Sequence, residues 1–219
     1  MRNNSIPRAA ICFFTLLLLA FTAFTAEPQK LYETNFEKAE PDKVPEDFLV
    51  LDGGFAVKEE GGNKFLELPG APLDTYGLLF GPTEPANVDV SARIFGTSKG
   101  RRFPAFAIGA NGVGGLKLQI SAAKKQLELF KGEEVIASAP YTWESGNWTM
   151  LRLQVRKSKE GEFKVQGKAW KQADKEPEKW LIDHTLTADL PAGRASIWGN
   201  PFSGTPIRFD DFSVSKLAP

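Results

Sequence analysis

The chain has 219 residues, with 27 Lys or Arg and 27 Asp or Glu, so its formal net charge is zero. Residues 1–26 hold Arg2, Arg8 and no acidic residue, so residues 27–219 carry 25 basic and 27 acidic groups. This slight acidic excess argues against nucleic acid as a partner, because contacts to phosphates need a basic surplus. The only cysteine is Cys12, which excludes disulfides and thiolate metal sites from residues 27–219.

Residues 1–26 have the pattern of a secretory signal peptide. Arg2 and Arg8 lead into an apolar run over residues 9–24, and cleavage is expected after Ala26. The alternative is an uncleaved anchor, although about sixteen apolar residues is short of the roughly 20 that span a membrane. No later run approaches that length, so we expect no membrane span in the mature chain and a secreted or periplasmic protein.

Residues 27–219 predict a single all-β domain. Apolar and polar residues alternate with a period of two, which is typical of half-buried strands, over residues 87–94, 116–120, 151–156 and 163–169. Glycine-containing turn signals separate these runs, as at 60–63, 111–112, 131–133 and 145–147. Short strands with such spacing indicate a sandwich or jelly roll.

The stretch 121–131 (SAAKKQLELFK) is ambiguous, because it contains good helix formers. Leu127 and Leu129 alternate with Glu128, so we interpret the stretch as a turn that leads into a strand over residues 126–130. A short helix is the alternative.

The polar positions of the alternating strands are candidates for a groove. A strand that covers a core with its apolar face turns its other face outward. The residues predicted to face outward are Arg93, Lys117, Gln119, Lys168 and Trp170. They could line a ligand groove, and they could equally be ordinary solvated surface.

Four segments have recognisable strand motifs: residues 32–37 (YETNFE), 52–57 (DGGFAV), 147–155 (NWTMLRLQV) and 209–214 (FDDFSV). In this order they resemble the first two strands, a recurrent strand and the closing strand of the concanavalin A-like lectin/glucanase superfamily. The segment from Lys168 to Trp180 is similar to laminin-G-like and 3-keto-disaccharide hydrolase-like members. The resemblance implies a jelly-roll sandwich of two curved antiparallel sheets, often with carbohydrate on the concave face.

The resemblance also implies a structural Ca²⁺ ion. Superfamily members often hold this ion between the opening strand, the next turn and the closing strand, with hard oxygen ligands. Glu37, Gly53 and Asp211 fall at matching positions, with Asp210 as a second choice. The alternative is that Asp210 and Asp211 are edge-strand charges that discourage aggregation.

The sequence offers little for catalysis. The superfamily's glucanases carry Glu-x-Asp-x-Glu on one strand, so that two carboxylates act on one glycosidic bond. This chain has no such triplet, and Glu128 has no acidic residue two positions away. His184 is the only histidine, and no Gly-x-Ser-x-Gly elbow supplies a nucleophile. We therefore name no catalytic residue.

Tryptophans are the more informative residues, because sugar rings stack on flat aromatic faces. Trp170 is the best candidate, since it continues the polar side of its strand. Trp198 precedes the turn at 199–201 and is expected on a loop at the rim of a groove, whereas Trp148 is expected in the core.

The first hypothesis is an exported carbohydrate- or glycoconjugate-binding protein without catalysis. The second is an enzyme of the 3-keto-disaccharide hydrolase type acting on keto-sugars. The third is a structural envelope protein that binds another protein, which a large exposed apolar patch would favour.

Overall fold

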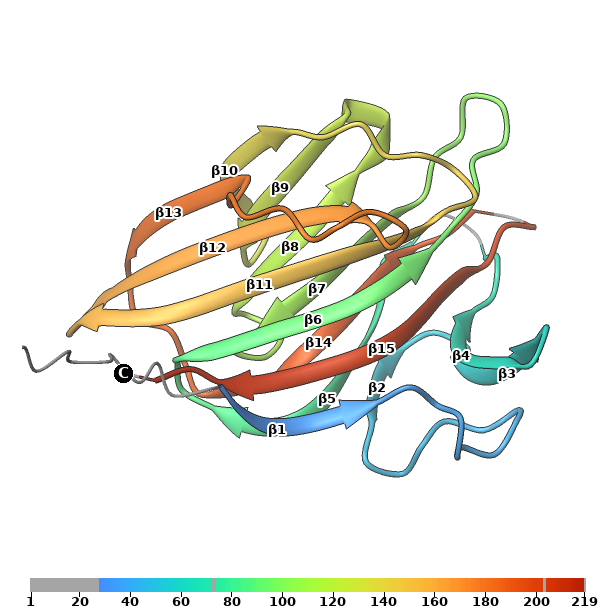
Figure 1. Ribbon diagram of the computed structural model, residues 1–219, viewed down its shortest axis with the longest axis horizontal. Coiled ribbons are helices and arrows are strands. Elements are labelled where there is room, and N and C mark those ends of the chain that lie inside the picture. Colours follow the sequence, from blue (N-terminus) through green and yellow to red (C-terminus); the bar gives the residue numbers. More distant parts are fainter. Residues whose placement is uncertain (1–27, 72–73, 203, 219) are drawn as a thin grey trace, which may run out of the picture.

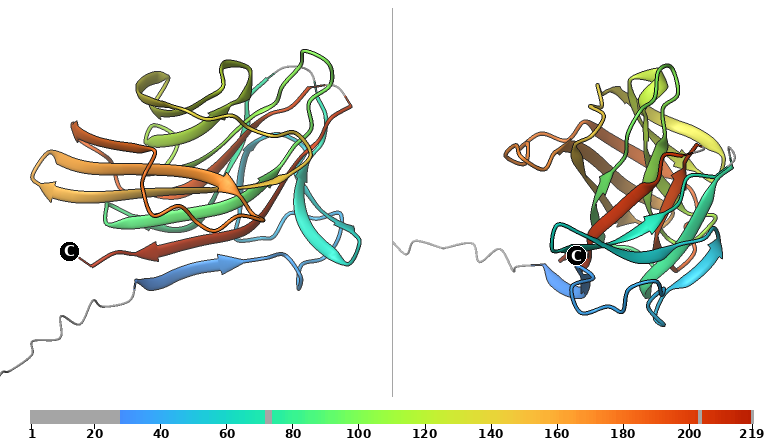
Figure 2. Two further views of the ribbon diagram at one scale, coloured as in Figure 1. Left: turned by 45° about the horizontal axis from the view of Figure 1, so that its top comes forward. Right: turned by 90° about the vertical axis from the view of Figure 1, so that its right-hand side faces the viewer.

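The computed structural model describes residues 28–71, 74–202 and 204–218, so the predicted signal peptide and its cleavage site lie outside the described residues. No helix in these ranges is long and apolar enough to cross a membrane. The described chain forms two antiparallel β-sheets that face one another (Figures 1 and 2). This confirms the predicted all-β jelly-roll sandwich.

Sheet A contains eight strands. Seven follow the order β13-β12-β11-β6-β15-β4-β3, and β1 pairs with β15. In chain order they are β1 (Gln29–Thr34), β3 (Ala56–Glu60), β4 (Asn63–Leu68), β6 (Val88–Phe95), β11 (Trp148–Lys159), β12 (Glu162–Lys171), β13 (Ile182–Thr187) and β15 (Ile207–Lys216).

Sheet B contains seven strands in the order β10-β9-β8-β7-β14-β5-β2. In chain order they are β2 (Leu49–Asp52), β5 (Tyr76–Glu84), β7 (Ala105–Ala110), β8 (Leu116–Ser121), β9 (Gln126–Lys131), β10 (Glu134–Pro140) and β14 (Gly193–Asn200). The ambiguous stretch folds as predicted into a turn and a strand. The turn is one 3₁₀ segment, Ala122–Lys124, which ends at Lys125 in a left-handed conformation, and β9 follows.

The core lies between the sheets and is made from one face of each strand. On β8, Leu116, Leu118 and Ile120 are buried, while the side chains between them face outward. On β11, Leu151, Leu153 and Val155 are fully buried in the same way. The alternation in the sequence therefore marks which side chains leave the core.

A cluster of four phenylalanines joins the two sheets. Phe212 of β15 in sheet A lies 4.6 Å, between ring centroids, from Phe80 of β5 in sheet B. Phe36 and Phe48, from the connection between β1 and β2, lie 5.2 and 5.8 Å from Phe212. Aromatic pairs at these distances gain energy beyond the area that they bury.

A β-bulge allows Phe212 to reach this cluster. The pairing of β15 with β6 moves from Asp210–Arg93 to Ser213–Ser91, so β15 has one extra residue there. Asp211 takes up the irregularity with a φ of 50°. Phe209 and Phe212, three positions apart, are both fully buried as a result, which strict alternation would not allow.

Replacing Phe212 by alanine should lower the free energy of unfolding by about 3–5 kcal/mol, because the ring leaves a cavity between the sheets. Chemical denaturation of residues 27–219, the predicted mature domain, measures this. Leu49→Ala is the control, since Leu49 is 51% exposed and its loss should cost less than about 0.5 kcal/mol. Equal losses for the two variants would contradict the assigned core.

Candidate functional site

The six residues predicted to bind a ligand divide between the two sheets. Lys117, Gln119 and Trp198 lie on the outer face of sheet B, where they line a common cavity. Arg93, Lys168 and Trp170 belong to strands of sheet A. The sheets turn their outer faces in opposite directions, so these residues cannot line one groove.

Trp198 belongs to β14 and to the surface of sheet B, so the expectation of a loop position was wrong. Its indole lies across Gly77 of the neighbouring strand β5, where an added Cβ would come within 2.4 Å of the ring atom Cε3. The indole Nε1 donates a hydrogen bond to the hydroxyl of Ser196 at 2.9 Å. Glycine at position 77 and this hydrogen bond fix the ring on the sheet.

Two adjoining cavities flank this indole, of about 210 and 250 Å³. Both are lined by Thr75, Lys117, Glu133 and Trp198, so together they form one groove, which we call the sheet B groove. The cavity of about 210 Å³ is also lined by Gln119, Phe130 and Asn200, and the cavity of about 250 Å³ is also lined by Val113 and three glycines.

Lys117 is the cation of the sheet B groove. Its ammonium lies 4.7 Å from the centroid of Phe130 and 5.8 Å from that of Trp198. Such contacts are attractive because the face of an aromatic ring is negative. Among the described residues, no carboxylate lies within ion-pair distance of this ammonium. The Lys117 ammonium therefore keeps donors for a ligand.

A buried polar chain holds Gln119 at the groove. Its amide nitrogen donates to the hydroxyl of Ser121 at 2.9 Å, and that hydroxyl donates to the Glu128 carboxylate. Glu128 is 3% exposed, and the ammonium of Lys124 compensates its charge at 2.9 Å. Buried polar groups that are fully paired make a rigid support, so the amide of Gln119 presents its remaining groups in a set direction.

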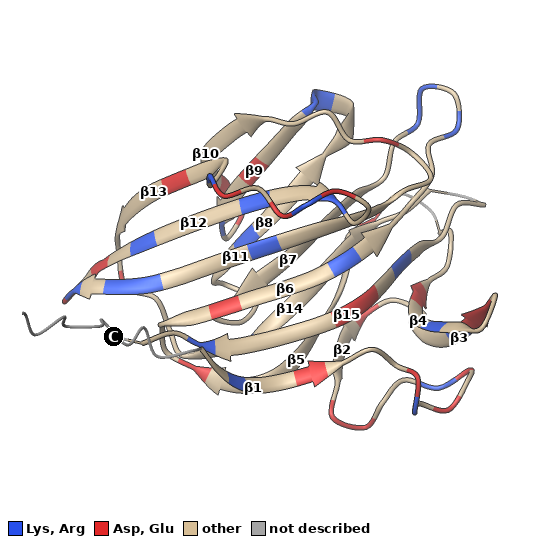
Figure 3. Ribbon diagram, in the orientation of Figure 1, with Lys and Arg blue, Asp and Glu red and all other residues tan. Residues whose placement is uncertain are grey.

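Arg93 and Lys168 of sheet A are committed to other protein groups. The Arg93 guanidinium pairs with Asp210 at 2.6 Å and lies 4.6 Å from the ring centroid of Trp148. Lys168 is 5% exposed and donates to Glu176 at 2.7 Å and to the carbonyl of Pro177 at 2.8 Å. Figure 3 shows basic bands side by side on β6, β11 and β12. On sheet A, Arg93 and Lys168 bind acidic side chains and a loop carbonyl of the protein itself.

The expected core position of Trp148 was also wrong. It was predicted in the core, but it alternates with the buried Thr149 and Leu151 and lies on the outer face of sheet A. Its ring packs against Phe95 at 5.6 Å and against Phe65 at 6.3 Å. The ring of Trp148 is therefore partly covered by aromatic rings on the same outer face. The sequence of β11 alone could not show this, because those rings belong to other strands.

Glu37, Gly53 and Asp211, predicted to bind Ca²⁺, do not converge. The Glu37 carboxylate accepts from the amide of Lys64 at the start of β4, whereas Gly53 lies against Leu68 at its end. Four residues along a strand span about 13 Å, whereas Ca²⁺ ligands lie about 2.3–2.6 Å from the ion. Glu37 and Gly53 therefore lie toward opposite ends of β4, and the structure does not bring them together around one point.

Oxygen atoms of Glu37 and Asp211 also have protein partners. The ammonium of Lys64 binds the carbonyls of Glu37 and Ala39 at 3.2 and 3.0 Å, and Arg93 pairs with Asp211 at 2.8 Å. Asp210 is fully buried and also bound to Arg93, and burial raises its pKa. In the described ranges, no group of three His, Cys, Asp or Glu side chains could hold a metal ion.

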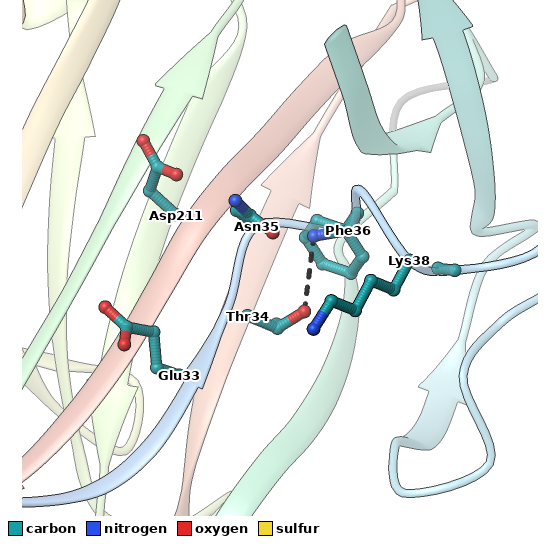
Figure 4. A pocket seen from close by; sticks show the side chains of 7 residues that line it. Glu33, Thr34, Asn35, Phe36, Lys38 and Asp211 are labelled. Atoms are coloured by element: carbon teal, nitrogen blue, oxygen red, sulfur yellow. Dashed lines mark hydrogen bonds between the residues drawn. The ribbon is translucent and has the colours of Figure 1, made fainter.

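A third cavity, of about 400 Å³, lies between β1, the segment after it and the bulge of β15. Glu33 and Asp211 extend to the same side of it (Figure 4). Both carboxylates are paired, Glu33 with Lys30 at 2.6 Å and Asp211 with Arg93. The one aromatic residue of the lining, Phe36, is 1% exposed and offers no face to a sugar.

No protein-family model and no curated protein sequence matches this chain. Solved structures do match. A Bacillus subtilis protein of unknown function with a galectin-like fold aligns with a TM-score of 0.60 at 12% identity, over 88% of this chain and 98% of that one. The carbohydrate-binding module CBM66 from Bacillus subtilis aligns with a TM-score of 0.54 at 12% identity, over 78% and 96%.

The carbohydrate recognition domain of Emp47p also aligns, with a TM-score of 0.56 at 12% identity, over 91% of this chain and all of that one. Identities this low define the fold alone. The chain therefore has the concanavalin A-like β-sandwich fold of lectin-like domains, as the sequence motifs indicate.

Gly77→Ala should displace the indole of Trp198, because the added Cβ and the ring cannot share the same space. We expect altered near-ultraviolet circular dichroism and a loss of about 1–3 kcal/mol of unfolding free energy. Gly114→Ala is the matched control, since nothing lies within 4 Å of its added Cβ. An unchanged spectrum for Gly77→Ala would contradict the position of the ring.

Chelators should leave the melting temperature unchanged to within about 1 °C, because Lys64 and Arg93 already supply positive charge beside Glu37 and Asp211. An ion bound at 100 times its dissociation constant would stabilise the fold by about 2.7 kcal/mol. Melting the mature domain with EGTA and with Ca²⁺ measures the difference. A rise of several degrees with Ca²⁺ would show that the domain holds the ion that the resemblance implies.

Proposed function

We propose that this protein is an exported, non-catalytic carbohydrate-binding protein, and that the sheet B groove is its binding site. The observation that carries the proposal is the indole of Trp198, laid flat over Gly77 inside a groove with polar side chains along it. Sugars present a C–H face that stacks on such a ring and hydroxyls that need hydrogen-bonding partners around it.

The groove supplies both kinds of partner. Lys117 offers N–H donors, Glu133 offers carboxylate acceptors, and the amides of Gln119 and Asn200 offer both. The amide of Asn200 donates a hydrogen bond to the hydroxyl of Thr75 at 3.2 Å, which holds these two groups beside the Trp198 ring. The two cavities on either side of Trp198 and Lys117 would accommodate neighbouring sugar residues.

We infer that the groove is not catalytic because of the residues that line it. Glu133 is the one carboxylate among the described residues that line the two cavities, whereas glycoside hydrolysis ordinarily uses two. His184 belongs to β13 of the other sheet and so cannot assist at this groove. Export is supported by the sequence of residues 1–26.

The structural neighbours support a sugar as the ligand, because their names include a carbohydrate-binding module and a carbohydrate recognition domain. Their low identity gives no guidance on which sugar this chain would bind. The proposal therefore rests on the residues of the sheet B groove, and the neighbours support it at the level of the fold.

Trp198→Ala should weaken binding to the preferred glycan at least tenfold, which corresponds to about 1.4 kcal/mol. A glycan array with the mature domain identifies that glycan, and calorimetry measures its affinity. Phe103→Ala is the matched control, because it removes a 41% exposed aromatic ring that lines neither cavity of the groove, and it should change the affinity less than twofold. The proposal fails if no glycan binds, or if Trp198→Ala binds as tightly as the unmodified domain. Release of product from a bound glycoside would contradict the absence of catalysis.

A further inference from the structure

The outer face of sheet A has a cavity of its own, of about 160 Å³. It lies between Pro28, just before β1, and the loop that joins β12 to β13. Its lining combines an aromatic ring, hydroxyl groups and charged groups: Pro28, Asp89, Ser91, Met150, Arg152, Trp170, Glu176, Ser213 and Ser215. We call it the sheet A cavity.

The loop between β12 and β13 forms one wall of this cavity and is firmly attached. It lies in front of β11 and β12 in Figure 1. Glu176 of the loop pairs with Arg152 at 2.6 Å and with Lys168 at 2.7 Å, and the ring of Trp180 lies 4.4 Å from the Lys168 ammonium. Burial raises the pKa of Glu176, but these two cations outweigh it and lower the pKa.

Three serines on neighbouring strands line the same cavity. Ser91 of β6 and Ser213 of β15 are cross-strand partners, and Ser215 follows on the same face. Asp89 and Arg93, whose side chains are larger than that of serine, occupy the positions before and after Ser91 on that face. The serines therefore leave a hollow, and their hydroxyls make no hydrogen bond to other described residues.

Trp170 and Met150 supply the apolar part of the lining. They are cross-strand partners on β12 and β11, and both line the cavity. Trp170 is half-buried, so part of its surface remains open to a ligand. An aromatic surface beside free hydroxyls matches the alternation of C–H and O–H groups on a sugar.

The charges that line the sheet A cavity are already paired. Asp89 is 6% exposed and binds Arg152 through both carboxylate oxygens, at 2.6 to 3.1 Å. Arg152 also binds Glu176, so an anionic ligand would have to displace a carboxylate from it. A buried, paired charge is costly to separate. The cavity therefore favours an uncharged ligand.

We propose that the sheet A cavity is a second saccharide-binding site, specific for a neutral sugar residue, on the face opposite to the sheet B groove. Trp170 and Met150 contact the C–H face, and the three serine hydroxyls bind the sugar hydroxyls. The cavity is smaller than either half of the groove, which suits a single residue at a chain end. With both sites occupied, one domain bridges two glycans.

The test uses the mature domain carrying Trp198→Ala, in which the sheet B groove is disabled, on an array of neutral, sialylated and sulfated glycans. We expect it to retain a set of neutral glycans. Adding either Trp170→Ala or Ser213→Val should weaken that set at least tenfold. Ser138→Val, on the exposed edge strand β10, is the matched control and should have no effect. Melting curves confirm that each variant folds. If Trp198→Ala does not fold, the Trp170→Ala single variant is compared with the unmodified domain on the same array.

The proposal is overturned if the Trp198→Ala domain binds no glycan that the unmodified domain binds, or binds chiefly sialylated or sulfated ones. It is also overturned if the retained glycans survive both Trp170→Ala and Ser213→Val. Failure of the proposed function gives a different result, in which Trp198→Ala changes no affinity while Trp170→Ala still removes the neutral set.

Discussion

Burial of one face of every long strand between two sheets is the constraint on which the rest of this structure depends. Phe212 and Phe80 meet across the interface, with Phe36 and Phe48 beside them, so the sheets share one core. Once that face is buried, every second side chain points away from the core. The molecule therefore has two outer faces, and its candidate sites must lie on them.

The outer faces use their polar residues differently. On sheet A, Arg93, Arg152 and Lys168 are paired with acids of neighbouring strands and loops, which leaves few charges free for a ligand. On sheet B, glycine and alanine at Gly77 and Ala107 lie next to Trp198 in the sheet register and leave space for its ring. Lys117 there has aromatic rings beside it and, among the described residues, no carboxylate within ion-pair distance. This combination makes sheet B the more favourable face for a ligand.

Much of this could be predicted from the sequence, because alternation is a local property. It identified the strands and the outward direction of Lys117 and Lys168. It could not assign these residues to different sheets, because sheet membership depends on pairing between distant strands, such as β14 with β5 and β7. The bulge at Asp211 shifts the alternation within β15, and neighbouring rings cover Trp148 on its outer face. The sequence likewise could not show that Glu37 and Gly53, two of the predicted Ca²⁺ ligands, contact opposite ends of β4.

The central claim, that the sheet B groove binds a saccharide, is tested most directly by mapping amide chemical shifts of the ¹⁵N-labelled mature domain while its preferred glycan is added. We expect the largest shifts to include the indole N–H of Trp198 and the amides of Lys117, Gln119 and Asn200. Shifts confined to the strands of sheet A, or to the cavity beside Glu33 and Asp211, would contradict it.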